Sequence, residues 1–175
     1  MLRIETICRP FEELLLLNVK LQKGLLPMLV YTLGTFDLLH VGHLALLNHC
    51  KTLGDTLAVG VASDNVVRMY KPNIPVVPLE QRMEMLSALS CVDIVRPYHE
   101  LEYVSGCKAL NIDIFVIGED WGSKPHNLDV NEYIKKTGKK IIQVRYNSRT
   151  SSTKIKELVL AQAKIQTDEI TFKFC

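Results

Sequence analysis

The chain has 175 residues, 47% of them hydrophobic, and a formal net charge of +2. This composition supports a folded core and excludes global disorder, and the small net charge gives no electrostatic basis for binding nucleic acid or membranes. The five cysteines are odd in number and form no CxxC pair, which favours reduced thiols and a cytoplasmic location over a disulfide framework.

Residues 1–27 allow two interpretations. The run FEELLLLNVKLQKG at 11–24 could form an amphipathic helix that ends near Gly24, with Pro27 as a stop. Alternatively, Met28 directly precedes the first strand, and residues 1–27 could be translated upstream sequence from a wrongly assigned start. The longest apolar run here is too short to span a bilayer.

From Met28 onward, apolar runs of the buried-strand type alternate with helical patterns. In chain order we predict a strand at 28–33, a helix at 41–55, a strand at 56–63, a proline-containing loop at 68–78, a helix at 79–90 and a strand at 92–97. There follow a helix at 100–110, a strand at 112–118, a helix at 130–140, a strand at 141–146 and a last helix at 151–165.

This alternation predicts an α/β fold: a Rossmann-like, doubly wound parallel sheet of about five strands with helices on both faces. We expect residues 28–165 to form this domain, with 1–27 as an extension and 166–175 as a tail. In such a sheet, ligands bind beyond the carboxyl ends of the strands. The sequence contains neither a P-loop nor a G-x-G-x-x-G motif.

The stretch GTFDLLHVGH at 34–43 lies at this ligand edge by topology. His40 and His43 are three residues apart on the first turn of a predicted helix, and Gly42 lets backbone approach closely between them. Free N–H groups at a helix N-terminus attract anions, and imidazoles can donate hydrogen bonds to the same anion. A zinc site is the rival interpretation, but a third ligand of the HExxH kind is missing.

The run YTLGTFDLLHVGHLALL resembles the HxGH signature of the Rossmann-like nucleotidyltransferase superfamily, in particular its cytidylyltransferase branch and the glycerol-3-phosphate cytidylyltransferases. The resemblance continues in the same order through VGVASD, PLEQRMEMLSALSCVDIV, IDIFVIGEDW and SSTKIKEL, and covers about residues 28–160. It implies that a phosphate oxygen of an acceptor attacks the α-phosphorus of CTP. Pyrophosphate then leaves, and Mg²⁺ accompanies the triphosphate.

The resemblance also implies roles for individual residues. His40 and His43 would stabilise the transition state, together with Lys71. The nucleotide would contact Thr35, Phe36, Gly42, Gly118, Asp120, Trp121, Arg149, Thr150, Ser151, Ser152 and Thr153. The acceptor would contact Asp37, Arg68, Arg82 and Lys108, although Asp37 also suits a polar network and Arg82 could form a surface ion pair with Glu84. His49, His99 and His126 are interpreted as structural, and no metal-ligand set is expected.

The sequence departs from the family pattern where the acceptor phosphate should bind. The loop at 68–78 contains one lysine instead of two, and the last motif reads YNSRTSST, with its arginine displaced and its glycine absent. The segment NIPVVPLEQRMEMLSALSCVDIV also resembles the adenylyltransferase that activates heptose 1-phosphate. ATP is therefore an alternative to CTP, and a sugar phosphate an alternative to glycerol 3-phosphate.

We therefore expect an enzyme that joins CTP, or ATP, to a small phosphorylated metabolite. A non-catalytic nucleotide-binding module is the alternative, motivated by the altered lysines. A role on RNA is disfavoured because the chain is short and its charge nearly neutral. The family often forms homodimers, and the apolar content permits one here.

Overall fold

The computed structural model describes residues 26–70, 74–119, 121–122, 124–145 and 150–173, with 166–173 as backbone only. Five parallel strands form one sheet in the order β3-β2-β1-β4-β5. They are β1 (Leu29–Gly34), β2 (Thr56–Ala62), β3 (Ile94–Tyr98), β4 (Ile114–Gly118) and β5 (Lys140–Val144). The predicted fold class is therefore confirmed.

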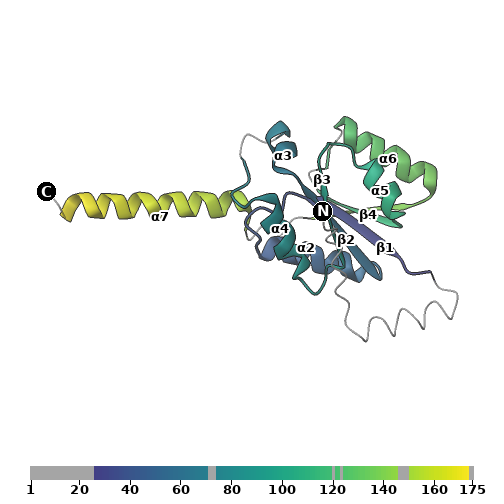
Figure 1. Ribbon diagram of the computed structural model, residues 1–175, viewed down its shortest axis with the longest axis horizontal. Coiled ribbons are helices and arrows are strands. Elements are labelled where there is room, and N and C mark those ends of the chain that lie inside the picture. The colour runs from purple at the N-terminus through teal and green to yellow at the C-terminus, as the bar shows by residue number, and fades with distance from the viewer. Residues whose placement is uncertain (1–25, 71–73, 120, 123, 146–149, 174–175) are drawn as a thin grey trace.

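Helices cover both faces of this sheet (Figure 1). On one face lie α2 (Val41–Thr52) and α4 (Leu79–Ser87), and on the other lie α5 (Val104–Leu110) and α6 (Pro125–Thr137). The short helix α3 (Asp64–Tyr70) follows β2, and α7 (Ser152–Lys173) closes the described chain. Because every crossover between parallel strands carries a helix, the loops at the carboxyl ends of the strands converge on one edge.

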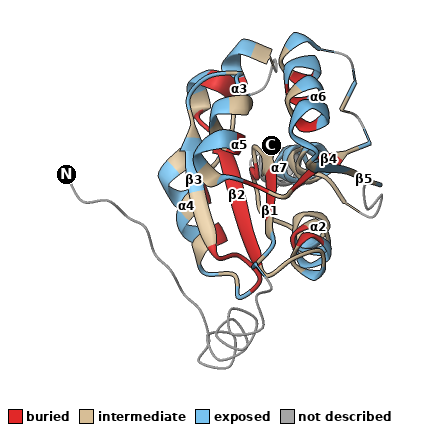
Figure 2. Ribbon diagram, turned by 90° about the vertical axis from the view of Figure 1, so that its right-hand side faces the viewer, coloured by how far each residue is buried: buried red, intermediate tan, exposed pale blue. Residues whose placement is uncertain are grey.

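The core lies in two layers, one on each face of the sheet. Leu47, Leu57 and Leu86 belong to the layer beneath α2 and α4, whereas Phe115 and Ile134 belong to the layer beneath α5 and α6. Every residue of β2 is buried, and Figure 2 shows the buried colour running along this strand. Burial on both faces explains why the strands read as continuous apolar runs rather than alternating ones.

The predicted loop at 68–78 is wrong in its first three residues, because α3 extends to Tyr70. Ser63 caps the start of this helix: its Oγ accepts a hydrogen bond from the N–H of Val66, and its carbonyl accepts one from the N–H of Val67. Val66 and Val67 are both buried. Two buried residues in a seven-residue helix are too few for a periodic pattern, so the sequence did not reveal it.

Other boundaries also differ from the prediction. Helix α6 begins at Pro125 rather than residue 130, because proline at the first helical position sacrifices no hydrogen bond. It ends at Thr137 and is followed by Gly138, whose φ of 67° suits the left-handed position past a helix. Helix α7 continues to Lys173, beyond the predicted end at 165, and extends away from the α/β body in Figure 1.

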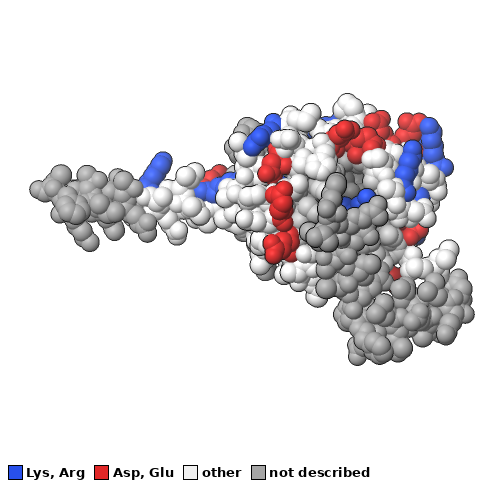
Figure 3. All heavy atoms as spheres, in the orientation of Figure 1, with Lys and Arg blue, Asp and Glu red and all other residues white. Residues whose placement is uncertain are grey.

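The surface carries both signs of charge. On the face shown in Figure 3, the described lysine and arginine side chains are scattered among acidic ones. Among the described residues, no helix has the length and hydropathy that crossing a membrane requires.

Candidate functional site

A cavity of about 550 Å³ opens where β1 and β4 end and α2 and α7 begin. Adjacent strands β1 and β4 lead their helices to opposite faces, so their carboxyl ends form the crevice in which such sheets bind ligands. The residues that line it from these elements include Thr35, Phe36, Asp37, His43, Gly118, Ser152, Thr153 and Lys156.

The loop from β1 to α2 holds a strained backbone. Phe36 and Leu38 have φ values of 53° and 49°, in the left-handed region that non-glycine residues rarely adopt. The ring of Phe36 is 3% exposed, and its centroid lies 5.3 Å from that of His43. Each such conformation costs about 1–3 kcal/mol and clusters at functional sites. Burial of Phe36 holds this loop in place beside His43.

The two motif histidines lie against each other at the start of α2. Their ring centroids are 3.9 Å apart with an interplanar angle of 20°. His40 is the N-cap residue of α2, and its Nδ1 accepts a hydrogen bond from the N–H of Gly42 at 3.1 Å. That bond assigns the proton to Nε2 in the neutral ring. Burial lowers the pKa of His40, which also favours the neutral ring at pH 7.

Gly42 is required by the packing of this turn. A Cβ built on Gly42 would lie 2.9 Å from Cε1 of His40 and 3.6 Å from the carbonyl oxygen of Thr150. Any side chain there would therefore displace the His40 ring, whereas the Thr150 carbonyl would stay at ordinary contact distance. The glycine between the histidines thus leaves room for the His40 ring to fold back over the start of α2.

The N-terminus of α7 lies at the same cavity. Ser151 caps it, since its Oγ accepts a hydrogen bond from the N–H of Lys154 at 3.1 Å. Ser152 Oγ donates to the carbonyl of Asp37 at 2.6 Å, which joins α7 to the β1–α2 loop. Two helix N-termini thus face one cavity, an arrangement that attracts a polyanion.

Asp37 connects three segments at the floor of the site. Its Oδ1 accepts hydrogen bonds from the N–H groups of Val76 and Val77 at 3.0 Å, and its Oδ2 lies 2.8 Å from Lys156 Nζ. Burial alone would raise the pKa of Asp37, but the hydrogen bonds from Lys156, Val77 and Val76 outweigh it and lower this pKa. The carboxylate is engaged within the protein, which fits the predicted polar network better than acceptor contact.

Arg82 corrects two predictions. Its side chain is fully buried and donates to the carbonyls of Thr35, Ala62 and Val77, and it pairs with Asp64 at 2.5 Å. Burial of Arg82 excludes the surface ion pair with Glu84. Its guanidinium already bonds to three carbonyls and one carboxylate of the protein, so it is not available to bind an acceptor substrate. Arg82 instead fixes the ends of β1 and β2 relative to the loop before α4.

Two further residues predicted to bind the acceptor do not line the described cavity. Arg68 is exposed on α3 and does not line the cavity, because the buried face of α3 is formed by the preceding valines. Lys108 is exposed on α5, and its Nζ lies 5.9 Å from the ring centroid of Tyr133 on α6. The side chain therefore contacts the outer helical layer and not the cavity.

Some predicted site residues lie outside the described residues, namely Lys71, Asp120 and Arg149. Gly118 and Trp121 line the cavity, so the structure brings them together with Thr35 and Phe36. The Trp121 ring packs at 5.5 Å from Phe115, and its carbonyl accepts a hydrogen bond from Asn127. Their contacts with a nucleotide remain predictions.

A second group of residues that line the cavity is not predicted by the sequence. Helix α3 contributes Tyr70, the segment from β3 to α5 contributes Tyr98 and Tyr103, and the start of α6 contributes Lys124 and His126. His126 was interpreted as structural, yet it lines the cavity. No single motif contains these residues, and only the fold places them together. Pro125 could have indicated Lys124 from the sequence, because proline is common at the first position of a helix, and the start of a helix after a strand lies at the ligand edge.

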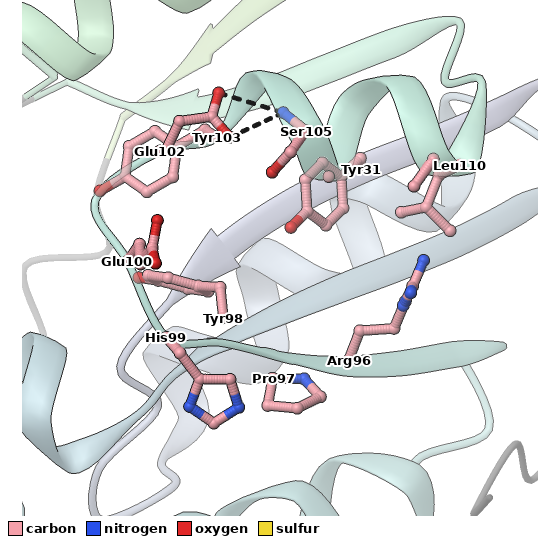
Figure 4. Close-up of a pocket in the computed structure, with 12 residues that line it drawn as sticks. Tyr31, Arg96, Pro97, Tyr98, His99, Glu100, Glu102, Tyr103, Ser105 and Leu110 are labelled. Atoms are coloured by element: carbon pink, nitrogen blue, oxygen red, sulfur yellow. Dashed lines mark hydrogen bonds between the residues drawn. The ribbon is translucent and has the colours of Figure 1, made fainter.

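A smaller cavity of about 320 Å³ adjoins this group beneath α5, and Figure 4 shows its lining. Tyr98 and Tyr103 line both cavities, with ring centroids 5.6 Å apart. The hydroxyl-bearing ring of Tyr31 and the side chain of Arg96 flank the smaller one. The tyrosine pair is therefore the wall between the two spaces.

A scan against family models matches residues 31–158 to the cytidylyltransferase-like family. Together with the fold and the histidine motif at the carboxyl edge, this match defines the class of protein: the chain belongs to the cytidylyltransferase-like family, within the nucleotidyltransferase superfamily.

Among curated proteins, the chain is 38% identical over 129 residues to the bifunctional protein HldE of Helicobacter pylori, strain HPAG1 (73% of this chain, 27% of that protein). It is 35% identical over 153 residues to the HldE of Pectobacterium carotovorum (87% of this chain, 32% of that protein). The chain thus spans about a third or less of these relatives.

Among solved structures, a lipopolysaccharide core biosynthesis protein from Thermoplasma volcanium is 31% identical, with a TM-score of 0.59 over 71% of this chain and 99% of that one. A protein of unknown function from Archaeoglobus fulgidus, at 24% identity and a TM-score of 0.50, has the same fold.

Proposed function

We propose that the protein transfers a nucleotidyl group from a nucleoside triphosphate to the phosphate of a small phosphorylated sugar. An oxygen of the acceptor phosphate attacks the α-phosphorus, the bond from that phosphorus to the oxygen bridging to the β-phosphate breaks, and pyrophosphate leaves. The observation that carries this proposal is His43, which lines the cavity together with the start of α7 and whose ring stacks on that of His40 at the N-cap of α2.

The chemistry follows from charge and position. In phosphoryl-type substitutions the protein contributes mainly alignment and stabilisation of negative charge. The N-terminus of α7 and Lys156 suit the β- and γ-phosphates, and the imidazoles of His40 and His43 suit the oxygens of the α-phosphorus as hydrogen-bond donors. Deprotonation of the nucleophile is not required, because a phosphate monoester already carries negative oxygens near pH 7.

Mg²⁺ would arrive with the triphosphate. Hard oxygen ligands suit this ion, but Asp37 is the one acidic side chain that lines the described part of the cavity, and it pairs with Lys156. Among the described residues, no cluster of three or more potential ligands exists. We therefore assign the ion to phosphate oxygens rather than to a protein cage.

ATP and heptose 1-phosphate are the favoured substrates. Their support is the similarity to part of the bifunctional HldE proteins. We propose that the chain has the nucleotidyl-transferring activity of that part. CTP with glycerol 3-phosphate is the second candidate, favoured by the match to the cytidylyltransferase-like family. We also propose a homodimer, because members of the family often form one.

The test is a matrix of ATP or CTP with heptose 1-phosphate or glycerol 3-phosphate, each with Mg²⁺. Pyrophosphate release and the nucleotide-linked product are measured together. We expect the ATP and heptose 1-phosphate pair to give the highest kcat/KM. Preference for CTP with glycerol 3-phosphate would favour the second candidate. Tight nucleotide binding without turnover on any acceptor would identify a binding module.

A further inference from the structure

The proposed reaction brings together two anions, because an acceptor phosphate must approach the α-phosphate of a triphosphate. A cation dedicated to the acceptor is therefore needed. Of the residues predicted for this role, Arg68 and Lys108 lie off the cavity and Arg82 is buried among protein acceptors. The lysines that line the described cavity are Lys124 and Lys156.

These two lysines differ in their surroundings. Lys156 lies on α7, 2.8 Å from Asp37, beside the helix N-terminus that suits the triphosphate. Lys124 precedes α6, is exposed, and forms no ion pair with any residue in the described part of the chain. An incoming anion is attracted more strongly to a lysine whose field is not offset by a described carboxylate.

Lys124 is nevertheless held in place. Its Nζ lies 5.8 Å from the ring centroid of Tyr70, within the range of a cation–π contact. The hydroxyl of Tyr70 lies 3.2 Å from Oγ1 of Thr35, in the loop that leads to the histidines. Contacts thus run from Lys124 through Tyr70 to Thr35, and they link the cation to the loop that carries His40.

The wall beside Lys124 is aromatic. Tyr103 packs edge-on against His126 at 5.2 Å and lies 5.9 Å from Trp121. Burial and then the charge of Lys124 lower the pKa of His126, against an opposite effect of Asp129, so the ring is a neutral hydrogen-bonding group. Flat apolar rings with polar edges suit the carbon skeleton and hydroxyls of a sugar.

We infer that Lys124, positioned by Tyr70, is the residue that binds the phosphate of the acceptor, and that the aromatic wall of Tyr103, Trp121 and His126 receives its polyhydroxylated carbon skeleton. This inference rests on the proposed function and assigns the acceptor half of the same cavity. The class of ligand is a phosphomonoester of a sugar.

The experiment compares Lys124→Gln with Lys135→Gln, which removes the same charge from an exposed position near the end of α6. For Lys124→Gln we expect KM for heptose 1-phosphate to rise at least about tenfold, the scale of one charge-assisted hydrogen bond. The Kd for a non-hydrolysable ATP analogue should stay within about twofold, as should every constant of Lys135→Gln.

Further variants separate positioning from charge. Lys124→Arg should restore most of the affinity for heptose 1-phosphate. Tyr70→Leu, which removes the ring under Lys124, should raise the acceptor KM about threefold to tenfold with little effect on nucleotide binding. Tyr70→Phe keeps the ring and should change KM less than Tyr70→Leu. An unchanged acceptor KM in Lys124→Gln, or a loss of nucleotide affinity instead, would overturn the inference.

Failure of the proposed function is a distinct result. If the wild-type protein releases no pyrophosphate with heptose 1-phosphate, its binding is measured by calorimetry with the ATP analogue present, and free heptose serves as the phosphate-free control. Binding of heptose 1-phosphate that Lys124→Gln weakens would sustain the subsite without the reaction. Equal binding of both sugars, or of neither, would reject the subsite.

Discussion

The two halves of the cavity are built in different ways. The half around His43 and the N-terminus of α7 comes from two short segments, each of which carries its polar groups within a few consecutive residues. The half around Tyr70, Tyr103 and Lys124 takes single residues from three separate elements. A chain that must hold a triphosphate uses helix N-termini, which are local features, whereas recognition of an acceptor depends on side chains that the fold gathers.

The largest effect should come from the nucleotide half. We expect His43→Ala to lower kcat by about 10²–10³-fold, the scale for losing one donor to a developing charge. His40→Ala should act similarly and should also free the N–H of Gly42. Pyrophosphate release under saturating substrates measures both.

His49→Ala is the matched control, since this residue is exposed in the last turn of the same helix. Its kcat should equal that of the wild-type protein. Near-normal kcat in both His40→Ala and His43→Ala would contradict the catalytic role of the histidine pair. This half of the cavity would then only bind the nucleotide.

The junction between the halves should be the most sensitive point for stability. Arg82→Met removes the donor shared by Thr35, Ala62 and Val77 and leaves Asp64 without its partner. We expect the free energy of unfolding to fall by about 3–5 kcal/mol, because three carbonyls lose a buried donor at about 1–3 kcal/mol each. Urea denaturation followed by circular dichroism measures it.

Glu84→Ala is the control for Arg82→Met, because the sequence also allows a surface ion pair between Glu84 and Arg82. Glu84 is exposed, and we expect its loss to change stability by less than about 0.5 kcal/mol. Equal destabilisation by both substitutions would mean that burial of Arg82 is not what fixes the ends of β1 and β2.

The contrast also explains what the sequence could reveal. Continuous apolar strands and intervening helices predicted the sheet, and the HxGH spacing predicted two rings side by side at the start of α2, because both are local patterns. Arg82 looked like a surface residue, because its partners are carbonyls up to 47 positions away. Lys124 and Tyr70 are 54 positions apart, and neither belongs to a recognisable motif, so only the tertiary structure brings them together.

A smaller effect should follow from the cap of α7. Ser151→Ala removes the Oγ that accepts from the N–H of Lys154, and should lower the free energy of unfolding by about 1 kcal/mol. Ser151→Asp should retain the cap but place a negative charge near the triphosphate, so KM for the nucleotide should rise while stability stays close to that of the wild-type protein. A nucleotide KM that is unchanged in Ser151→Asp would place the phosphates elsewhere.

The smallest effect concerns the pH dependence of Asp37, which joins the nucleotide half to the loop before α4. Because the folded protein lowers the pKa of this carboxyl below its ordinary value, its contribution is present above the pKa of the unfolded chain and is lost as the pH falls through the folded pKa. Unfolding free energy should therefore decline as the pH is lowered below about 4. The slope in this window should be smaller in Asp37→Asn, by a total of about 1 kcal/mol or less, because Lys156 is partly exposed to solvent.

Lys156→Met isolates the cause of that slope. This variant keeps the carboxylate and its hydrogen bonds from Val76 and Val77 but removes the cation, so the pKa of Asp37 should move upward. Its stability should then decline less steeply with acid than that of the wild-type protein, though more than that of Asp37→Asn. Identical slopes in all three proteins, measured by urea denaturation between pH 3 and 5, would show that the ion pair does not hold the floor of the site.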